Sequence, residues 1–258
     1  MEVVTKAEER LDEHGYLVLE EFMGAELLNN VRARVKELLD EEGEKAGVEF
    51  KQELGARRLA NLMDKGEIFQ TIVVSPEILQ YVGFVLGPRF KLSSLNVRSA
   101  SPYNEVQPLH ADSGAIVDEQ GYWVCNSLWM LDEITEQNAA VRVVPGSHRR
   151  GRLPEDVLED PRRFHPDEIL LTGAAGTVVI MNSHLWHGAA ANRTERPRIA
   201  MHAFYTRWDK PQQQYQKQLI RPQVQSQFSA ELRRLLALDD PLNDRLSSRS
   251  SGQSGFLK

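Results

Sequence analysis

The spacing of apolar residues changes character near residue 90, with helical periods before it and short strands after it. We predict an amphipathic helix over 27–39, ended by the charged run 41–45. Shorter helices are predicted over 5–14 and 76–85, the second opened by Pro76 and closed by Gly87-Pro88, and a strand over 16–19 after the Gly15 break. One apolar face is predicted for the long helix: Leu27, Leu28, Val31, Val35, Leu38 and Leu39.

Short β-rich runs separated by Gly, Pro and Asn follow, which is typical of a sandwich or barrel. They lie at 90–99, 122–131, 141–144, 169–171, 177–181 and 198–206. Helices before a β core indicate an α+β fold with a jelly-roll core (double-stranded β-helix, cupin-like) at about 90–207 and an N-terminal helical buttress at about 5–88. A tail at about 208–258 carries an amphipathic stretch at 227–237, and disorder is expected in its last dozen residues. We expect residues 1–258 to form a single domain.

Composition narrows the function classes. A chain of 258 residues, 41% hydrophobic, buries a core without disulfides, and its one cysteine, Cys125, excludes an intramolecular disulfide and a Cys-based zinc site. The polar, acidic N-terminus and the lack of an 18-residue apolar run predict a soluble, cytoplasmic protein without a membrane partner. The net charge of -6 argues against nucleic acid, so a small molecule is the expected partner.

Candidate metal chemistry begins at His110-Ala111-Asp112, because residues i and i+2 of a strand point to the same side. His184 and His187 follow the apolar run that ends at Met181. Two histidines and one carboxylate that leave other positions open form the facial triad of non-heme Fe(II) oxygenases.

The strand that starts at Arg198 places Arg198, Ala200, His202 and Phe204 on one face. A guanidinium there suits a planar carboxylate, which it binds through two hydrogen bonds. We expect this strand to form an antiparallel hairpin with the strand of His187, which would bring the arginine close to the metal ligands.

Several short motifs occur in the order and spacing of one known family. His187 and Arg198 lie 11 positions apart (198 − 187), as that family's pattern requires. The motifs are His110-x-Asp112, Pro145-Gly146-Ser147-His148, Trp186-His187-Gly188, Asn192 and Arg198. Together they resemble the phytanoyl-CoA dioxygenase family of Fe(II)- and 2-oxoglutarate-dependent oxygenases over roughly residues 10–207, and the segment 75–88 resembles the helix ahead of that family's core strands.

The resemblance implies an enzyme that uses O2 and 2-oxoglutarate to oxidise a small molecule, most simply by hydroxylation, with release of succinate and CO2. The carboxylate at Asp112 favours hydroxylation, desaturation or ring closure over halogenation. By the same resemblance, Fe(II) is held by His110, Asp112 and His187, and the distal carboxylate of 2-oxoglutarate by Arg198. Further co-substrate contacts are implied at Asn126, Asn96 and Arg57, or at Arg58 in place of Arg57.

The sequence departs from the family pattern at two positions, and each departure predicts a local structural feature. Leu128 stands where the family often has Trp, which leaves Trp129 pointing the other way. Ala139 replaces a usual Gly, which is tolerable if its φ stays negative.

Alternatives remain for single residues and for the whole protein. His184 is the rival metal ligand, His148 belongs to a turn that is structural in the family, and His202 and Trp186 are candidate pocket residues. His14 and His165 are expected in solvent, and Arg207 or Arg221 is a candidate contact for an anionic substrate. A zinc hydrolase would not need Arg198, and a silent binding module would not need all four site residues. The substrate and the oligomeric state do not follow from the sequence.

Overall fold

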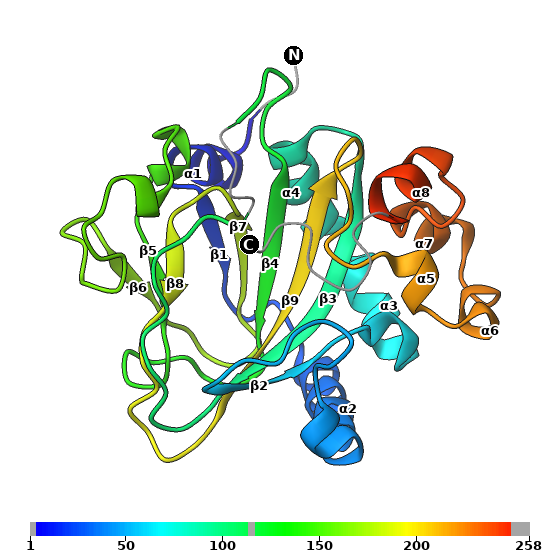
Figure 1. The fold of residues 1–258 in the computed structure, drawn as a ribbon, viewed down its shortest axis with the longest axis horizontal. Coiled ribbons are helices and arrows are strands. Elements are labelled where there is room, and N and C mark those ends of the chain that lie inside the picture. The colour runs from blue at the N-terminus through cyan, green and yellow to red at the C-terminus, as the bar shows by residue number, and fades with distance from the viewer. Residues whose placement is uncertain (1–3, 113–116, 249–258) are drawn as a thin grey trace.

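The computed structural model describes residues 4–112 and 117–248, which form two antiparallel sheets flanked by helices (Figure 1). The large sheet has the strand order β1-β7-β4-β9-β3-β2, and the small sheet the order β6-β5-β8. This is the predicted jelly-roll core. The strands are β1 (Tyr16–Leu19), β2 (Ala56–Leu59), β3 (Phe90–Ala100), β4 (Val124–Met130), β5 (Val141–Val143), β6 (Ile169–Leu171), β7 (Val178–Asn182), β8 (His187–Ala189) and β9 (Arg198–Arg207).

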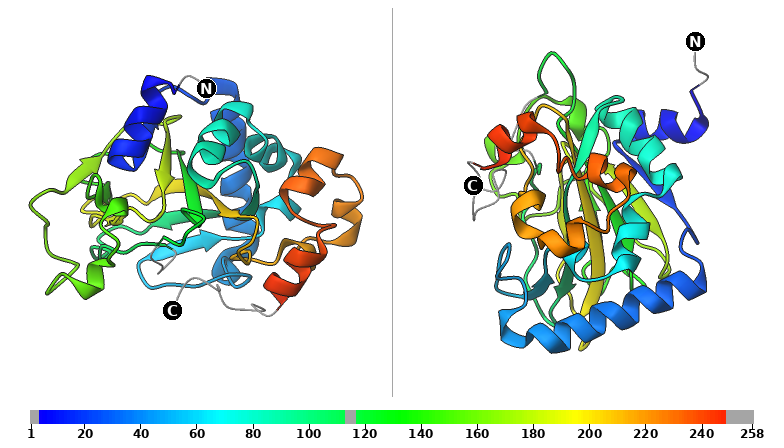
Figure 2. Two further views of the ribbon diagram at one scale, coloured as in Figure 1. Left: turned by 90° about the horizontal axis from the view of Figure 1, so that it is seen from above. Right: turned by 90° about the vertical axis from the view of Figure 1, so that its right-hand side faces the viewer.

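Helices cover one face and one edge of the large sheet. Figure 2 shows α3 and α4 on the face turned away from the viewer of Figure 1, α2 running from back to front beneath the strand ends, and α5 to α8 beside β3. Among the described residues no single helix has the length and hydropathy of a membrane span, which only α3 and α4 reach together across a 50° bend. The helices are α1 (Lys6–His14), α2 (Ala25–Glu42), α3 (Glu67–Val73), α4 (Pro76–Leu86), α5 (Gln216–Leu219), α6 (Pro222–Gln225), α7 (Ala230–Leu235) and α8 (Pro241–Ser247).

Strand β4 is buried along its whole length because it separates two cores. Trp129 faces the helices, where its ring meets that of Phe22 edge-on at 5.6 Å between centroids. Leu128 and Met130 alternate to the other face and pack between the sheets with Val179. The predicted direction of Trp129, away from Leu128, is therefore confirmed.

The elements predicted before residue 90 are present, and one further strand joins them. Helices α1, α2 and α4 and strand β1 confirm the predicted positions. Strand β2 was not predicted, and it extends the large sheet by pairing Ala56 with Ala100 and Leu59 with Val97. The N-terminal buttress thus also supplies an edge of the β core.

The segment after β9 is fastened to the sheet edge by buried glutamines. Gln212 Nε2 donates to the carbonyls of Leu92 at 2.8 Å and Leu236 at 3.0 Å, and Gln216 Nε2 donates to Ser93 O at 3.3 Å. The amphipathic stretch predicted at 227–237 contains α7. The disorder expected in the last dozen residues concerns mainly 249–258, which lie outside the described residues.

A buried ion pair ties β5 to the loop before β6. Arg142 Nε and Nη2 lie 2.8 and 2.7 Å from the two carboxylate oxygens of Glu168, and both side chains are 3% exposed. The remaining guanidinium hydrogen bonds go to the carbonyls of Gln107 and Arg163. Every part of this guanidinium is therefore engaged by the segments that frame the small sheet.

We predict that Glu168→Gln lowers the free energy of unfolding by about 3–5 kcal/mol, because it leaves the Arg142 charge buried without a counter-charge. Asp167→Asn is the matched control, since it removes the carboxylate of an exposed pair with Arg150 and is expected to cost about 0–1 kcal/mol. Urea unfolding curves of both variants measure the difference. Equal losses would show that the buried pair contributes no more than the exposed one.

Candidate metal centre

Three predicted ligands meet at one point on the inner side of the small sheet. The ligand atoms of His110, Asp112 and His187 all lie within 4.8 Å of one another. His110 Nε2 is 3.6 Å from Asp112 Oδ1, and His187 Nε2 is 3.5 Å from Asp112 Oδ2. Two imidazole nitrogens and one carboxylate oxygen around a common point suit Fe(II), so the donor set fits the ion that the sequence predicts.

Both imidazoles are oriented by the backbone. His110 Nδ1 lies 3.0 Å from Pro108 O, and His187 Nδ1 lies 2.7 Å from Leu185 O. A carbonyl oxygen only accepts, so each Nδ1 carries the proton and donates. The lone pair of each ring is thereby left on Nε2, which points to the common centre.

A backbone bridge brings the two histidines together. His110 N donates to His187 O at 2.8 Å, His187 N donates to His110 O at 2.9 Å, and Asp112 N donates to Ser183 O at 2.9 Å. The expectation that 110–112 is part of a regular strand is wrong, because His110 forms an isolated bridge and Asp112 lies in a turn. The two side chains still reach one point.

Gly188 makes the close approach possible. A Cβ at this position would lie 2.9 Å from Gln107 O and 3.0 Å from Pro108 O, both backbone atoms. Any other residue would push the segment before His110 away from β8. The glycine of the Trp-His-Gly motif thus has a packing role beside the metal ligand.

The buried carboxylate is held in its charged form. Burial alone would raise the pKa of Asp112, but the adjacent imidazoles of His187 and His110 lower it below its usual range. Burial alone would lower the pKa of His187, and Asp112 raises it. The site therefore presents an anionic oxygen that would be costly to bury without a cation.

A cavity of about 130 Å³ opens beside the triad, and the large sheet forms its other wall. The predicted face of β9 contributes Arg198, His202 and Phe204, as expected. Strands β3 and β4 add Asn96, Asn126 and Leu128.

The predicted hairpin between the strands of His187 and Arg198 is wrong. Strand β8 pairs with β5 in the small sheet, whereas β9 pairs with β3 and β4 in the large sheet. The chain changes sheets between the two residues. Arg198 therefore faces the metal ligands from the opposite wall of the cavity.

Arg198 is held by the turn that carries the Ala139 departure. Its Nη2 donates to Ala139 O at 2.6 Å and its Nε to Asn138 O at 3.3 Å, and the residue is 3% exposed. Burial, reinforced by the charge of Arg98, lowers the pKa of Arg198 to about 10, so it stays protonated at neutral pH. The condition under which alanine was expected to be tolerable, a negative φ, is not met: φ of Ala139 is +67°, and this conformation belongs to the turn whose carbonyls accept from the guanidinium.

The two predicted amides, Asn96 and Asn126, line the cavity, and each has a hydrogen-bond acceptor without a partner among the described residues. The Oδ1 atom of each is buried and has no hydrogen-bond partner among the described residues. Buried polar atoms are nearly always satisfied in folded proteins, so both atoms indicate a ligand or water in the cavity.

Of the two arginines on β2, the structure brings Arg58 and not Arg57 into the cavity. Arg57 Nη2 donates to Leu39 O at 2.7 Å, on the outer side of the strand. Arg58 alternates to the inner side and lines the cavity. Of these two candidates, only Arg58 can therefore contact a ligand in the cavity.

The other histidines have structural partners. His184 Nε2 accepts from Trp123 N at 2.9 Å, and His148 Nε2 lies 3.0 Å from Asp12 O. His165, predicted in solvent, has a side chain only 13% exposed and packs edge-on against Trp186. Trp186 is itself 1% exposed and does not line the cavity, so its suspected pocket role is not supported.

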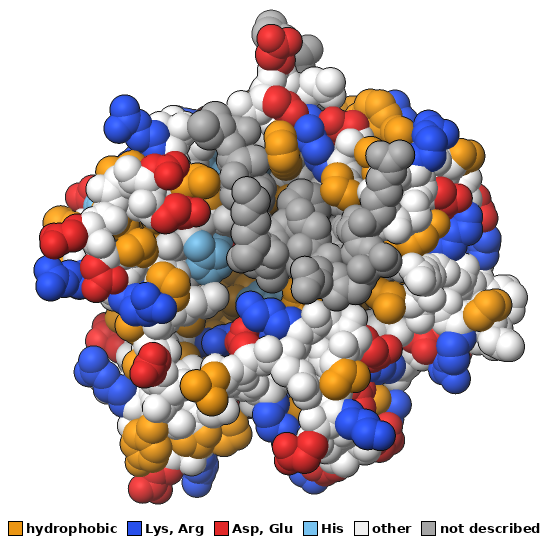
Figure 3. Space-filling view, in the orientation of Figure 1, with side chains coloured by type: hydrophobic (Ala, Val, Ile, Leu, Met, Phe, Trp, Pro, Cys, Tyr) orange, Lys and Arg blue, Asp and Glu red, His pale blue; other side chains and the backbone are white. Residues whose placement is uncertain are grey.

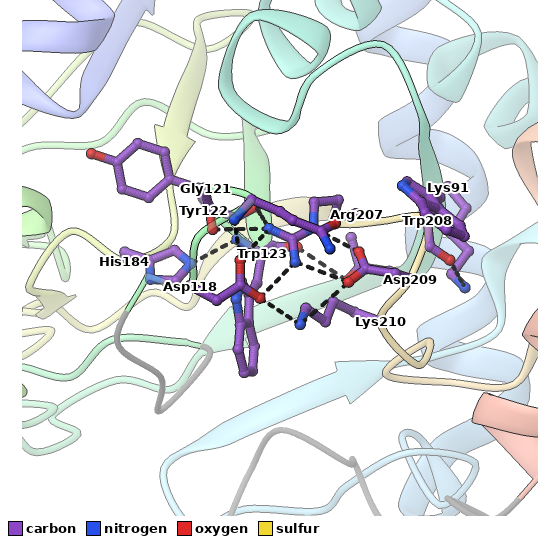
Figure 4. Close-up of polar contacts among 12 residues, drawn as sticks. Lys91, Asp118, Gly121, Tyr122, Trp123, His184, Arg207, Trp208, Asp209 and Lys210 are labelled. Carbon is purple, nitrogen blue, oxygen red and sulfur yellow. Dashed lines mark hydrogen bonds and ion pairs between the residues drawn. The ribbon is translucent and has the colours of Figure 1, made fainter.

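Neither Arg207 nor Arg221 lines the cavity beside the triad, and both are paired with carboxylates. Figure 4 shows Arg207 between Asp118 and Asp209, with its Nη2 2.7 Å from Asp118 Oδ2 and its Nε 2.6 Å from Asp209 Oδ1. Lys210 Nζ also contacts Asp118, at 2.8 Å. Arg221 pairs with Asp64 at 2.8 Å. These contacts fix the segment around Asp118 and the start of the C-terminal region.

Comparison with known proteins agrees with this geometry. The phytanoyl-CoA dioxygenase (PhyH) family model matches residues 11–200. Dioxygenase af480 of Aspergillus fumigatus is 27% identical over 186 residues, which cover 70% of this chain but only 58% of that protein.

Two solved structures share the fold at low sequence identity. The non-heme alpha ketoglutarate dependent carbocyclase SnoK from nogalamycin biosynthesis has a TM-score of 0.65 at 22% identity, covering 81% of this chain and 85% of its own. HygX from Streptomyces hygroscopicus, with nickel and 2-oxoglutarate bound, has a TM-score of 0.64 at 17% identity, covering 81% and 90%.

We predict that His187→Ala abolishes high-affinity Fe(II) binding, because it removes one of the three converging ligand atoms. His184→Asn is the control, since His184 lies outside the triad and Asn can still accept from Trp123 N. Anaerobic Fe(II) titration by calorimetry measures both, with circular dichroism as a check on folding. Loss of binding in His184→Asn with retention in His187→Ala would move the ligand to His184.

Proposed function

Because this chain belongs to the phytanoyl-CoA dioxygenase family, we propose that it is an Fe(II)- and 2-oxoglutarate-dependent dioxygenase of the cytoplasm. It oxidises a small molecule with O2, most simply by hydroxylation, and converts 2-oxoglutarate to succinate and CO2. The observation that carries this proposal is the convergence of His110, Asp112 and His187 opposite Arg198 in one cavity. A hydrolase using the same three ligands would not need the arginine.

In this proposal the chain holds the metal with three ligands and leaves the remaining positions open. Fe(II), when bound, supplies coordination of the 2-oxo acid and activation of O2. The carbonyls of Pro108 and Leu185 keep both imidazoles in the ligating orientation. Asp112 adds a negative charge, so a divalent cation in the site is stabilised more than a neutral water molecule would be.

Arg198 provides the counter-charge for the distal carboxylate of 2-oxoglutarate. A carboxylate that enters this cavity meets apolar side chains such as Leu128 and Phe204, so an unpaired charge would be costly. Arg198 is buried, protonated and already aimed by two carbonyls. The unpartnered amide atoms of Asn96 and Asn126 are the proposed hydrogen-bonding neighbours of the same co-substrate.

His202 is an uncharged hydrogen-bonding group on the cavity wall. Burial, together with the charges of Arg58, Arg198 and Arg98, lowers its pKa to about 3. At neutral pH the imidazole is therefore neutral and adds no charge beside the guanidiniums. We assign it a positioning role towards the co-substrate pocket.

We predict that Arg198→Ala weakens 2-oxoglutarate binding by roughly two to four decades, because losing one partner of a buried charge pair costs about 3–5 kcal/mol. Arg198→Lys keeps the charge but loses the two-pronged geometry, so its effect should be moderate. Calorimetric titration of 2-oxoglutarate measures both variants, and Fe(II) affinity, expected to be unchanged, is the control. Binding by Arg198→Ala at the level of the parent would place the anchor elsewhere, with Arg58 as the next candidate.

We also predict slow release of succinate from 2-oxoglutarate without any primary substrate. The enzyme loaded with Fe(II) would be incubated with 2-oxoglutarate in air, and succinate would be measured by mass spectrometry. Asp112→Ala, expected to be inactive, controls for free iron in solution. If the loaded parent neither binds nor consumes 2-oxoglutarate, the oxygenase proposal is wrong.

A further inference from the structure

A group of basic side chains borders the cavity beside the proposed co-substrate site. We call it the basic rim and define it as Lys51, Arg58 and Arg98, which line the cavity, with Glu53 between them. Figure 3 shows histidine and Lys or Arg side chains gathered around one recess on this face of the molecule. Such a group is unexpected from a net charge of -6.

Glu53 is the shared partner of all three rim cations. Its Oε2 lies 2.9 Å from Arg58 Nη2 and 3.6 Å from Lys51 Nζ, and its Oε1 lies 2.6 Å from Arg98 Nε. Burial opposes ionisation of Glu53, but the charges of Arg58 and Arg98 hold its pKa at about 2. One permanent negative charge therefore faces three positive charges.

The proposed metal and co-substrate do not use this excess. Fe(II) and Arg198 bring three positive charges, and Asp112 and the two carboxylates of 2-oxoglutarate bring three negative ones, so that half of the cavity is neutral. The basic rim keeps two positive charges beyond Glu53. Partly buried like charges repel one another in a medium of low dielectric, so this part of the cavity favours a further anion.

Arg58 has an unused donor at this place. Its side chain is 13% exposed, and its Nε is buried with no hydrogen-bond partner in the described part of the chain. Only Nη2 is taken by Glu53. Arg58 and Asp112 line the same cavity, so a ligand on Arg58 shares that cavity with the proposed metal centre.

Lys51 extends the rim towards solvent. Its side chain is 43% exposed, against 13% for Arg58 and Arg98. An anion that enters the cavity would first meet the hydrated ammonium of Lys51 and then the more buried guanidinium of Arg58. It would lose water as it moves from the first group to the second.

We propose that the primary substrate carries an anionic oxygen group, a carboxylate or a phosphate, which binds to Lys51 and Arg58 of the basic rim. Glu53 positions the guanidinium, and the C–H bond to be oxidised lies on the metal side of the anionic group. The inference deepens the proposed function and rests on it, since the charge balance assumes bound Fe(II) and 2-oxoglutarate.

The test uses matched probes on the Zn(II)-substituted protein saturated with 2-oxoglutarate. Small carboxylates, the corresponding primary amides and the corresponding phosphate monoesters would be compared by ligand-observed NMR. We expect at least one anionic series to bind about tenfold or more tightly than the amides, because hydrogen bonds to a charged partner are stronger than neutral ones. The preferred anion distinguishes a carboxylate from a phosphate substrate.

Two variants locate the anion site. Lys51→Gln and Arg58→Gln should each reduce the preference for anions over amides, and Lys51→Gln keeps the test valid if the buried variant fails to fold. Lys36→Gln is the control, because its side chain is 82% exposed on α2 and lies outside the cavity lining; it should keep the preference.

The outcomes separate this inference from the oxygenase proposal. Failure of the parent to bind 2-oxoglutarate in the first titration would overturn the proposed function. If 2-oxoglutarate binds and amides bind as tightly as anions, only the basic-rim inference is overturned. It is also overturned if the anions bind solely by displacing 2-oxoglutarate, which would place them on Arg198.

Discussion

The reciprocal backbone hydrogen bonds between His110 and His187 are the contact on which the site depends. They join the segment after β3 to the first residue of β8 and bring the two imidazole rings to 4.4 Å between centroids. Gly188 allows the approach, and the carbonyls two residues before each histidine turn the rings inwards. The backbone thus already orients both proposed imidazole ligands, which would limit the reorganisation that metal binding requires.

Buried charge is distributed unevenly between the two walls of the cavity. The small-sheet side carries Asp112, whereas the large-sheet side carries Arg58, Arg98 and Arg198. In a medium of low dielectric this separation produces a strong field between the walls. Burial, reinforced by the charges of Arg58, Arg198 and Arg98, lowers the pKa of His202 and keeps it neutral. A ligand with negative groups spaced to meet the guanidiniums is therefore recognised by its charge pattern as well as its shape.

Sequence reasoning identified the parts that depend on local periodicity and motif spacing. The apolar face of α2, the alternation of Leu128 and Trp129, and the shared face of Arg198 and His202 all follow from the helix and strand periods. The three proposed metal ligands came from residue type together with the family resemblance, and the structure brings their side chains to one point.

The features that were missed are those decided by distant partners. Strand β2 contains Arg57 and Arg58 and shows no apolar alternation, so only its pairing with β3 makes it a strand. The conformation at His110 depends on its bridge to His187, which lies 77 positions later in the chain (187 − 110). Strands β8 and β9 are consecutive in the sequence but belong to different sheets, and the residues between them do not indicate this. The positive φ of Ala139 contradicts the preference of alanine and is imposed by the buried turn around it.

That alanine has a consequence for the timing of molecular recognition. Glycine at the same place would leave the turn free to sample many backbone conformations, and the carbonyl that accepts from Arg198 would move with it. Alanine in this left-handed conformation costs about 1–2 kcal/mol, and the buried turn around it holds the conformation in the folded chain. The guanidinium is then already oriented when its ligand arrives, and the entropy of ordering is not lost again at each binding event. A small local penalty in the folded chain thus accompanies a guanidinium whose direction is set by two carbonyls of the turn.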